Sequence, residues 1–328
     1  MLKSGKLTNG GVMVNYRCSA ACRHCLYSCS PTREAGYVDE EAADAISHLL
    51  KKGGCRSVHI GGGEPFLDFK GLVMMIRKLG EAGIVLDYVE TNAFWAAETR
   101  KKTEEMLETL LALGASTLCI SVDPYHAEYV PYGAPLALAK LCEKTGMEYF
   151  LWRQEFLPML SKMDSRKVYS RPDMEEVFSG EYINNTARLY NIGYGGRAVN
   201  IEREFGVLSP AESFIRETLP CHNLLSTGHF HVDKNCCYLP PRCTGIRLPL
   251  EEAVDGIPPE KYPVFETLHN GGVSALFEFA LRHGFSPGRE GYPSKCNFCF
   301  YLRAFLAEKG FAELDKDHYE EALKYYWF

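Results

Sequence analysis

The stretch Arg17-Cys18-Ser19-Ala20-Ala21-Cys22-Arg23-His24-Cys25 gathers three cysteines in the spacing C-x3-C-x2-C. Three thiolates on one tight loop can ligate a 4Fe–4S cluster and leave its fourth iron open. An open metal position is typical of a site that carries out chemistry, whereas a fourth protein ligand closes a structural zinc site. His24 or Cys29 could be that fourth ligand, so zinc is the alternative. The ferredoxin spacing C-x2-C-x2-C-x3-C-P does not fit this stretch.

The composition is that of an ordinary globular protein. The chain has 328 residues, 46% of them hydrophobic and 24% charged, and a formal net charge of −6. This balance gives no indication of a nucleic-acid partner or an anionic membrane surface. No run of about 20 apolar residues predicts a membrane span. Residues 1–9 are polar, so we expect no export signal and a cytoplasmic protein.

Thirteen cysteines are many for such a protein, and their odd number argues against a disulfide framework. They fall in two groups, which we interpret as metal sites. The first group lies within residues 18–29. The second group comprises Cys221, Cys236, Cys237, Cys243, Cys296 and Cys299. The three cysteines between these groups, Cys55, Cys119 and Cys142, are expected to be small core residues.

Short apolar runs alternate with helical patterns over the first two thirds of the chain. Strands are expected at 11–15, 57–60, 84–90, 118–122, 149–152 and 189–192, and helices at 39–52, 69–82, 98–113 and 136–144. This alternation predicts an α/β fold with a parallel sheet. Each polar motif follows an expected strand, so the motifs should meet at one edge of the sheet. After about residue 210 the pattern becomes irregular, with helices expected at 275–283 and 302–309, flanking Cys296 and Cys299.

A glycine run, Gly61-Gly62-Gly63-Glu64-Pro65, follows the second expected strand. Together with the cysteine motif it resembles the radical S-adenosylmethionine (SAM) superfamily. The resemblance implies a partial (β/α)6 TIM-type barrel over residues 1–210, open on one side. It also implies that Cys18, Cys22 and Cys25 hold a 4Fe–4S cluster whose open iron chelates SAM. One electron, from a donor such as flavodoxin or ferredoxin, would then cleave SAM to methionine and a 5′-deoxyadenosyl radical.

The resemblance further implies a set of SAM contacts at the strand ends. The expected residues are Gly62, Gly63, Glu64, Asn92, Ser121, Asp123, Arg153 and Arg197. The glycines would admit SAM close to the backbone, and Glu64 would take its ammonium group. Asn92, Ser121 and Asp123 follow two strands and could instead cap helices. Arg153 could pair with the SAM carboxylate or form a structural salt bridge. Arg197 would lie near adenine and ribose, and His24 either near adenine or on the surface.

The C-terminal cysteines resemble the auxiliary-cluster domains called SPASM or twitch. This implies a second domain over residues 211–328, with a second 4Fe–4S cluster on Cys221, Cys243, Cys296 and Cys299. Zinc on the same four cysteines is the alternative. Cys236 and Cys237 are surplus to that set, so one of them could be a ligand, a free thiol or a hydrogen donor.

Several fragments resemble the short radical SAM peptide epimerases. They are residues 29–32, 63–68, 91–95 and 123–127. Those enzymes abstract a Cα hydrogen from a peptide, and a cysteine directly after a cluster ligand returns one to the opposite face. Here Thr244 follows Cys243, and the Cys-Cys pair lies six residues earlier. The sequence thus favours an enzyme acting on a peptide. A small-molecule enzyme on the same scaffold is the runner-up, and an electron carrier or zinc scaffold the remote alternative.

Overall fold

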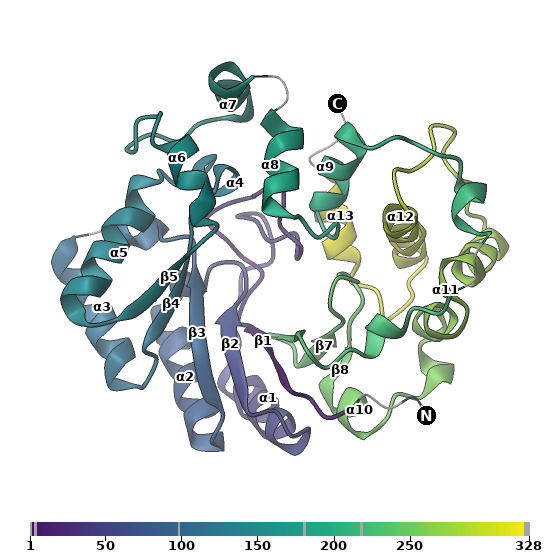
Figure 1. Ribbon diagram of the computed structural model, residues 1–328. Coiled ribbons are helices and arrows are strands. Elements are labelled where there is room, and N and C mark those ends of the chain that lie inside the picture. The colour runs from purple at the N-terminus through teal and green to yellow at the C-terminus, as the bar shows by residue number, and fades with distance from the viewer. Residues whose placement is uncertain (1, 3–4, 98, 180–181, 217–218, 325–328) are drawn as a thin grey trace.

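The computed structural model describes residues 2, 5–97, 99–179, 182–216 and 219–324 (Figure 1). Glu98, where the third expected helix begins, lies outside these residues. No helix in the described part is long and apolar enough to cross a membrane.

One sheet runs through the described residues. Its strands are β1 (Asn9–Met13), β2 (Ser57–Gly61), β3 (Val85–Thr91), β4 (Thr117–Ser121), β5 (Glu148–Trp152), β6 (Phe230–Asp233), β7 (Cys237–Leu239) and β8 (Leu248–Pro249). Their order across the sheet is β5-β4-β3-β2-β1-β6-β7-β8. Strands β1 to β6 pair in parallel, and β7 and β8 add antiparallel. The α/β class and the parallel barrel-type sheet are therefore confirmed.

The helices of the first segment follow its strands along the chain. They are α1 (Glu40–Lys52), α2 (Phe69–Ala82), α3 (Arg100–Ala112), α4 (Pro124–Ala127), α5 (Gly133–Thr145), α6 (Leu157–Leu160), α7 (Arg171–Phe178), α8 (Tyr182–Tyr190) and α9 (Ala198–Phe205). Figure 1 shows α1, α2, α3 and α5 outside the strands. A hydrophobic core joins α1 and α2 to the outward side chains of the strands, such as Val12, Ile60 and Leu118. The opposite face of the strands is the inner face of the partial barrel.

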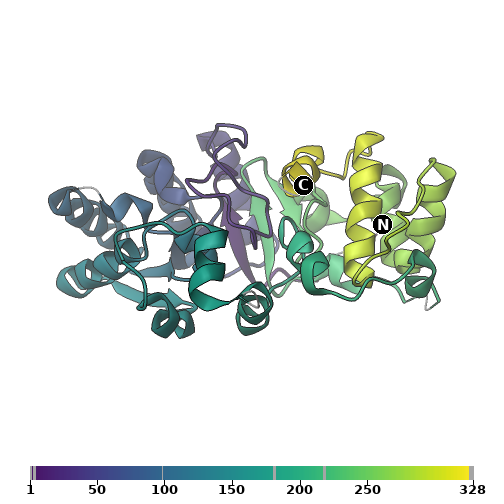
Figure 2. The same cartoon turned by 90° about the horizontal axis from the view of Figure 1, so that it is seen from above.

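The remaining helices belong to the second segment and build a second hydrophobic core, except α10 (Leu250–Asp255), whose Leu250 and Ala253 join the first core. The others are α11 (Pro263–Arg282), α12 (Lys295–Glu308) and α13 (Lys316–Lys324). The buried side chains of the second core come from residues 199–322. Figure 2 shows α11 and α12 at the end of the molecule opposite α3. The boundary near residue 210 stays a prediction, because β6, β7 and β8 belong to the second segment and yet extend the sheet of the first.

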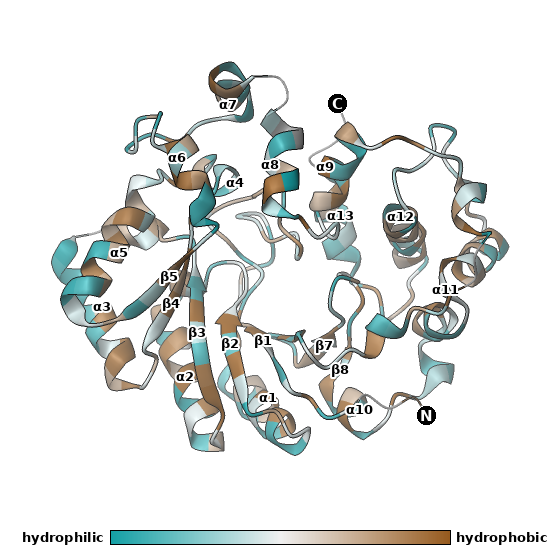
Figure 3. Cartoon of the chain, in the orientation of Figure 1, coloured by the Kyte–Doolittle hydropathy of each residue, from teal (hydrophilic) through white to brown (hydrophobic). Residues whose placement is uncertain are grey.

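Local sequence signals explain where the first helices begin and end. The side chain of Asp39 accepts a hydrogen bond from the Ala42 amide at the start of α1, and that of Asp68 caps α2 in the same way. Gly83 ends α2 in the left-handed conformation, with a φ of 74°. Figure 3 shows α1, α2 and α3 with apolar and polar stretches of ribbon, as expected of helices with one face on a core.

Two expectations about the elements are wrong. The strand expected at 189–192 is the end of α8, which buries Tyr182 and Ala187 while Leu189 is exposed; Asn191 then ends the helix at a φ of 55°. The sixth parallel strand is instead β6, on the other side of β1. The Cys296–Cys299 pair does not lie between two helices, because Ser294 caps α12 and both cysteines fall in its first turns.

Candidate active site

The three cysteines of the C-x3-C-x2-C motif lie in the loop between β1 and α1, at the carboxyl end of the parallel strands. Cys18 and Cys22 are buried and Cys25 is half-buried. Burial raises the pKa of the Cys18 thiol well above its ordinary value, and the charges of Cys22 and Cys25 raise it further. The three thiols therefore share one site, as the motif predicts. Buried thiolates this close fit an iron–sulfur cluster, since a cation must compensate their charge.

Cys29 closes the same loop. Its backbone amide lies 3.4 Å from Cys25 Sγ, and its own thiol lies 3.7 Å from the Gly62 carbonyl oxygen. The hydrogen bond from Cys29 lowers the pKa of the Cys25 thiol to about 5. Cys29 thus connects the cysteine loop to the glycine run.

The glycine run after β2 packs on the backbone of the cysteine loop. Gly62 has a φ of 146°, and a Cβ there would lie 2.8 Å from the Asn15 carbonyl oxygen. A Cβ on Gly63 would overlap the carbonyl group of Arg17. The Asn15 side chain accepts from the Gly63 amide and donates to the Glu64 carbonyl, both at 3.0 Å. The close approach that these glycines permit is therefore to the protein's own chain, and a SAM contact stays a prediction.

Glu64 links this loop to the end of the next strand. Its carboxylate accepts hydrogen bonds from Thr91 Oγ1 at 2.9 Å, the Asn92 amide at 2.8 Å and the Phe66 amide at 3.2 Å. Burial raises the pKa of this carboxyl to about 7, although the three hydrogen bonds lower it. Both oxygens are thus engaged within the protein, and the predicted contact with the SAM ammonium group would have to be shared with these donors.

Two side chains from the strand ends reach the cysteines. The Asn92 amide donates to Ser19 Oγ at 3.0 Å and lies 3.7 Å from Cys18 Sγ. His126, on α4, lies 2.7 Å through Nδ1 from Asp123 and hydrogen-bonds Cys22. Burial lowers the pKa of His126, but the charges of Asp123 and Cys22 outweigh burial and raise it well above its ordinary value.

His24, Asp123 and His126 form a compact group beside the loop. Their ligand atoms all lie within 4.8 Å of one another. The His24 ring stacks on Tyr125 with centroids 4.7 Å apart, and burial lowers the pKa of His24 to about 3. His24 is therefore a packed residue, not a surface histidine. Asp123 also caps α4, which was the alternative role.

Two further predicted SAM contacts, Ser121 and Arg153, lie at the ends of β4 and β5. Ser121 ends β4, opposite Trp152. Arg153 lies over the rings of Trp152 and Tyr190, at 5.0 and 4.6 Å, and pairs with Glu155 at 3.1 Å. This is the structural ion pair that the sequence left open.

Arg197 is buried directly under the cysteine loop. Its side chain donates to the backbone carbonyls of Cys22 and Cys29, and its amide donates to the carbonyl of Cys25. The described contacts of Arg197 therefore fix the shape of this loop. That Arg197 lies near the adenine and ribose of bound SAM stays a prediction.

The four predicted auxiliary ligands come together around Arg303. Burial raises the pKa of the Cys243 thiol, Arg303 lowers it, and the charges of Cys221 and Cys296 raise it again. The same three cysteines act on Cys299, whose pKa burial raises to about 12. Four thiols within electrostatic reach of one another fit a closed cluster or zinc site.

Cys236 and Cys237 lie elsewhere, at the end of the turn between β6 and β7 and at the first residue of β7. Cys236 has a φ of 57° and packs against the core of the first segment. Cys237 lines a small pocket with Arg247 and Tyr262. The described contacts of neither thiol reach the two cysteine groups, so the hydrogen-donor role stays a prediction.

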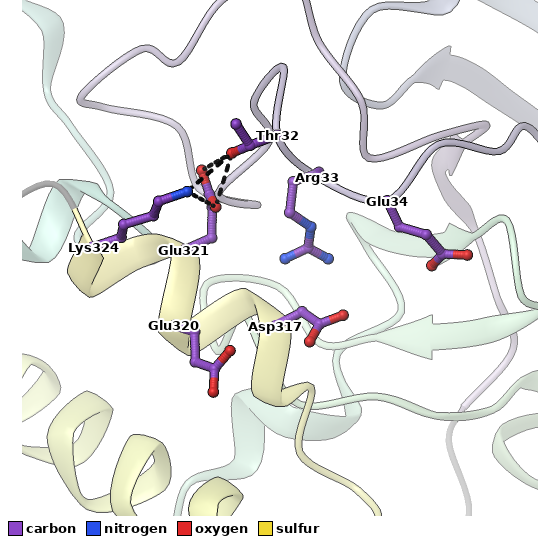
Figure 4. Close-up of a pocket in the computed structure, with 7 residues that line it drawn as sticks. All are labelled: Thr32, Arg33, Glu34, Asp317, Glu320, Glu321 and Lys324. Carbon is purple, nitrogen blue, oxygen red and sulfur yellow. Dashed lines mark hydrogen bonds and ion pairs between the residues drawn. The ribbon is translucent and has the colours of Figure 1, made fainter.

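Helix α13 closes the cysteine loop from the C-terminal side. Figure 4 shows a polar pocket between this helix and the loop, lined by Thr32, Arg33, Glu34, Asp317, Glu320, Glu321 and Lys324. Thr32 Oγ1 donates to Glu321 at 3.3 Å. Arg33 pairs with Asp315 at 3.3 Å and lies over the Tyr16 ring at 4.6 Å.

Sequence reasoning missed these supporting residues. Asn15 and Arg33 flank the cysteine motif, but nothing local indicates that they would bind the glycine run and residues near 315. His126 lies in the fragment 123–127, which the sequence singles out only for its resemblance to the peptide epimerases. The Asp-x-x-His spacing on an expected helix was the available signal, since residues three apart share a helix face.

Comparison with known proteins found similarity in the first segment of the chain. Residues 12–151 match the Radical SAM superfamily. YydG of Bacillus subtilis (strain 168), a protein named for peptide biosynthesis, is 34% identical over 121 residues. That match spans 36% of this chain and 37% of YydG, so about a third of each is compared.

Solved structures with a similar chain path have low sequence identity. Streptococcus suis SuiB bound to S-adenosylmethionine is 16% identical, with a TM-score of 0.45 over 83% of this chain and 68% of SuiB. Native anSMEcpe with bound AdoMet and Kp18Cys peptide is 14% identical, with a TM-score of 0.45 over 97% of this chain and 96% of that one. The match to the Radical SAM superfamily spans residues 12–151, which include the cysteine loop at the carboxyl edge of the parallel strands.

Proposed function

We propose that this protein is an enzyme that cleaves SAM reductively and uses the resulting radical to take a hydrogen atom from a peptide. The observation that carries the proposal is the meeting of Cys18, Cys22 and Cys25 on one buried loop within the segment that matches the Radical SAM superfamily. When bound there, a 4Fe–4S cluster would supply an open iron for SAM and the electron that cleaves it.

The surrounding residues prepare this loop for a cluster. Asn92 lies against Cys18 and His126 against Cys22, so each can donate a hydrogen bond that stabilises a thiolate. Arg197 holds the loop carbonyls and places a positive charge beneath the thiolates. Ser121, which ends β4, and Asp123, which follows that strand, are proposed to contact bound SAM.

A second cluster is proposed on Cys221, Cys243, Cys296 and Cys299. Its support is that these four thiols converge beside the buried Arg303, whose positive charge favours thiolates. Four protein ligands leave no open position, so this cluster would relay electrons or stabilise the second segment. A reduced flavodoxin or ferredoxin is the proposed electron donor.

A peptide is proposed as the substrate because YydG, the curated relative, is named for peptide biosynthesis. The inner face of the sheet also exposes Phe150 and Trp152, with 38% and 43% of their surface accessible. Exposed aromatic side chains on a concave face can bind apolar peptide side chains.

SAM cleavage tests the enzyme class. The reduced, cluster-loaded protein should convert SAM to 5′-deoxyadenosine and methionine, measured by liquid chromatography under anaerobic conditions. Cys22→Ala should abolish turnover, whereas Cys142→Ala, which removes a buried thiol outside both cysteine groups, should retain it. Turnover by Cys22→Ala would refute the assignment of the cluster.

The substrate class needs a separate assay. Short peptides encoded beside the gene should raise the rate of 5′-deoxyadenosine formation, and the peptide product should differ in mass or take up deuterium from D2O. SAM cleavage that no such peptide stimulates would favour the small-molecule alternative while leaving the enzyme class intact.

A further inference from the structure

Three histidines and one glutamate gather on the inner face of the sheet, apart from both cysteine groups. His59 belongs to β2, His231 to β6 and Glu90 to β3, while His229 precedes β6. Gly11 of β1 pairs in register with His59 on one side and His231 on the other. The two imidazoles therefore meet over the strand that separates them.

The distances within this histidine group suit a shared ion. His59 Nε2 lies 3.2 Å from His231 Nε2 and 3.8 Å from Glu90 Oε1. The His229 ring lies 5.1 Å from that of His231 and 5.6 Å from that of His59, between centroids. Two nitrogens bound to one tetrahedral zinc ion at about 2.0–2.1 Å are about 3.3–3.4 Å apart. The imidazole pair thus needs almost no movement to bind one ion, whereas the Glu90 carboxylate would have to turn from His59 toward the shared point.

Two glycines clear the space for these side-chain ends. A Cβ on Gly11 would overlap His59 Nε2 and lie 2.6 Å from His231 Cδ2. A Cβ on Gly61 would lie 2.5 Å from Glu90 Oε2. Any other residue at either position would push a ligand atom away from the shared point.

Burial keeps the two central imidazoles neutral. His59 and His231 are 4% and 9% exposed, and burial lowers the pKa of His59 to about 4 and that of His231 well below its ordinary value. Neutral imidazole is the form that binds a metal. The His59 ring also hydrogen-bonds the backbone of Gly10, an arrangement that orients metal-binding histidines. Glu90 is more open, with 44% of its side chain exposed, so an ion can reach the group from the barrel interior.

We propose that His59, His231 and Glu90, with His229 at the rim, bind one divalent zinc-type cation. Three nitrogen and oxygen ligands leave a coordination position for an oxygen atom of water or of a bound molecule. This site is separate from the cysteines and does not depend on SAM cleavage. The competing arrangement is a hydrogen bond between the two imidazoles with no ion.

Zinc binding to the cluster-loaded protein tests the proposal. The protein is purified anaerobically with its clusters, dialysed against Zn²⁺, passed through a chelating resin and assayed by metal analysis and zinc X-ray absorption. We expect one zinc per chain with nitrogen and oxygen neighbours at about 2.0–2.1 Å. No retained zinc, or zinc with sulfur neighbours at about 2.3 Å, would overturn the proposal.

Variants locate the ion. The double change His59→Asn with His231→Asn and the single change Glu90→Gln should each lower zinc affinity at least about tenfold. His48→Asn, on the exposed face of α1, is the matched control and should bind zinc as the parent does. Glu90→Gln serves as the readout if the double variant fails to fold, because Glu90 is only half-buried and glutamine has nearly the same shape. Unchanged affinity in Glu90→Gln would remove Glu90 from the site and overturn the proposal.

Discussion

Glu64 shows how a single buried carboxyl connects two strand ends. It is 1% exposed and accepts three hydrogen bonds, yet burial still raises its pKa from 4.5 to about 7. The folded protein therefore holds the proton over a pH range in which the unfolded chain has lost it. The contribution of this group to stability is complete below about pH 4.5 and is lost as the pH rises to about 7.

A change of Glu64 should alter this pH dependence. A shift of roughly 2.5 pKa units corresponds to about 3 kcal/mol, so Glu64→Gln should remove up to that much of the decline in unfolding free energy between pH 4.5 and 7. Urea denaturation at several pH values measures it, with Glu41→Gln on the surface of α1 as the control. An identical pH profile in both variants would contradict the raised pKa.

The cysteines make a separate prediction at the residue scale. The anaerobically purified protein should contain about eight irons, and Cys18→Ala, Cys22→Ala and Cys25→Ala combined should leave about four. Iron and acid-labile sulfide analysis measures both. About four irons with one zinc in the parent protein would instead place zinc on the C-terminal cysteines.

Single changes to Ala can show whether Cys236 or Cys237 is a hydrogen donor, a cluster ligand or neither. Only a protonated thiol can donate a hydrogen atom, so removal of a donor should keep the full iron content and SAM cleavage while the product fails to form. Removal of a ligand should lower the iron content. Full iron and full product in both variants would exclude the pair from the chemistry.

The C-x3-C-x2-C motif could be predicted from the sequence because its short spacing places three thiols on one loop, whereas the C-terminal set was expected only from a family resemblance. The four C-terminal cysteines also converge as predicted. His59 and His231 could not be identified in this way, because they lie 172 residues apart. Only the register of β6 beside β1 brings them together, and the four residues of β6 are too short a run to predict a strand.

At the scale of elements, the glycine run after β2 is held against the loop after β1. Gly63 has no room for a Cβ because the Arg17 carbonyl occupies that space. The contact is between two backbones, so neither partner can rotate away as a side chain could. This packing places the three cysteines relative to the strand ends.

Gly63→Ala should therefore destabilise the fold by at least about 2 kcal/mol and reduce iron content after reconstitution. Gly80→Ala is the matched control, because a Cβ at Gly80 on the exposed face of α2 meets no atom within 4 Å. That change should stabilise the protein by about 0.5–1 kcal/mol, since alanine favours a helix over glycine. Thermal and urea unfolding distinguish the two, and equal stability in both would contradict the packing.

Strand and helix periodicity predicted five of the parallel strands close to their positions, and their order follows from right-handed crossovers. The strands it missed are short. Strands β6, β7 and β8 have four, three and two residues, too few for a pattern of alternating burial. The mistaken strand at 189–192 arose because Leu, Tyr and Ile within four residues fit the last turn of a helix as well as a strand.

At the scale of the whole molecule, the second segment holds the cysteine loop of the first. Arg33 and Asp315 form an ion pair with side chains only 6% and 9% exposed. Tyr16 donates to Asp233 at 2.9 Å, which joins the same loop to β6. Separation of the two segments would expose these polar groups, so we expect them to unfold together.

Arg33→Met should cost about 3 kcal/mol of unfolding free energy, because it leaves Asp315 buried without its cation. It should also speed the loss of iron to a chelator, since the loop loses an anchor. Arg100→Met removes an exposed pair with Glu104 and should change stability by less than about 1 kcal/mol. A chelation rate equal to that of the parent would show that the C-terminal contacts do not stabilise the cysteine loop.

The contact between α13 and the cysteine loop has a consequence for biosynthesis. Thr32 and Glu321 meet across 289 residues of sequence. A ribosome adding 5–20 residues per second needs roughly 15–60 s to make that stretch. During this interval the newly made cysteines lack the helix that covers their loop, so iron and sulfide delivered by assembly factors would find the loop accessible only until the last helix docks.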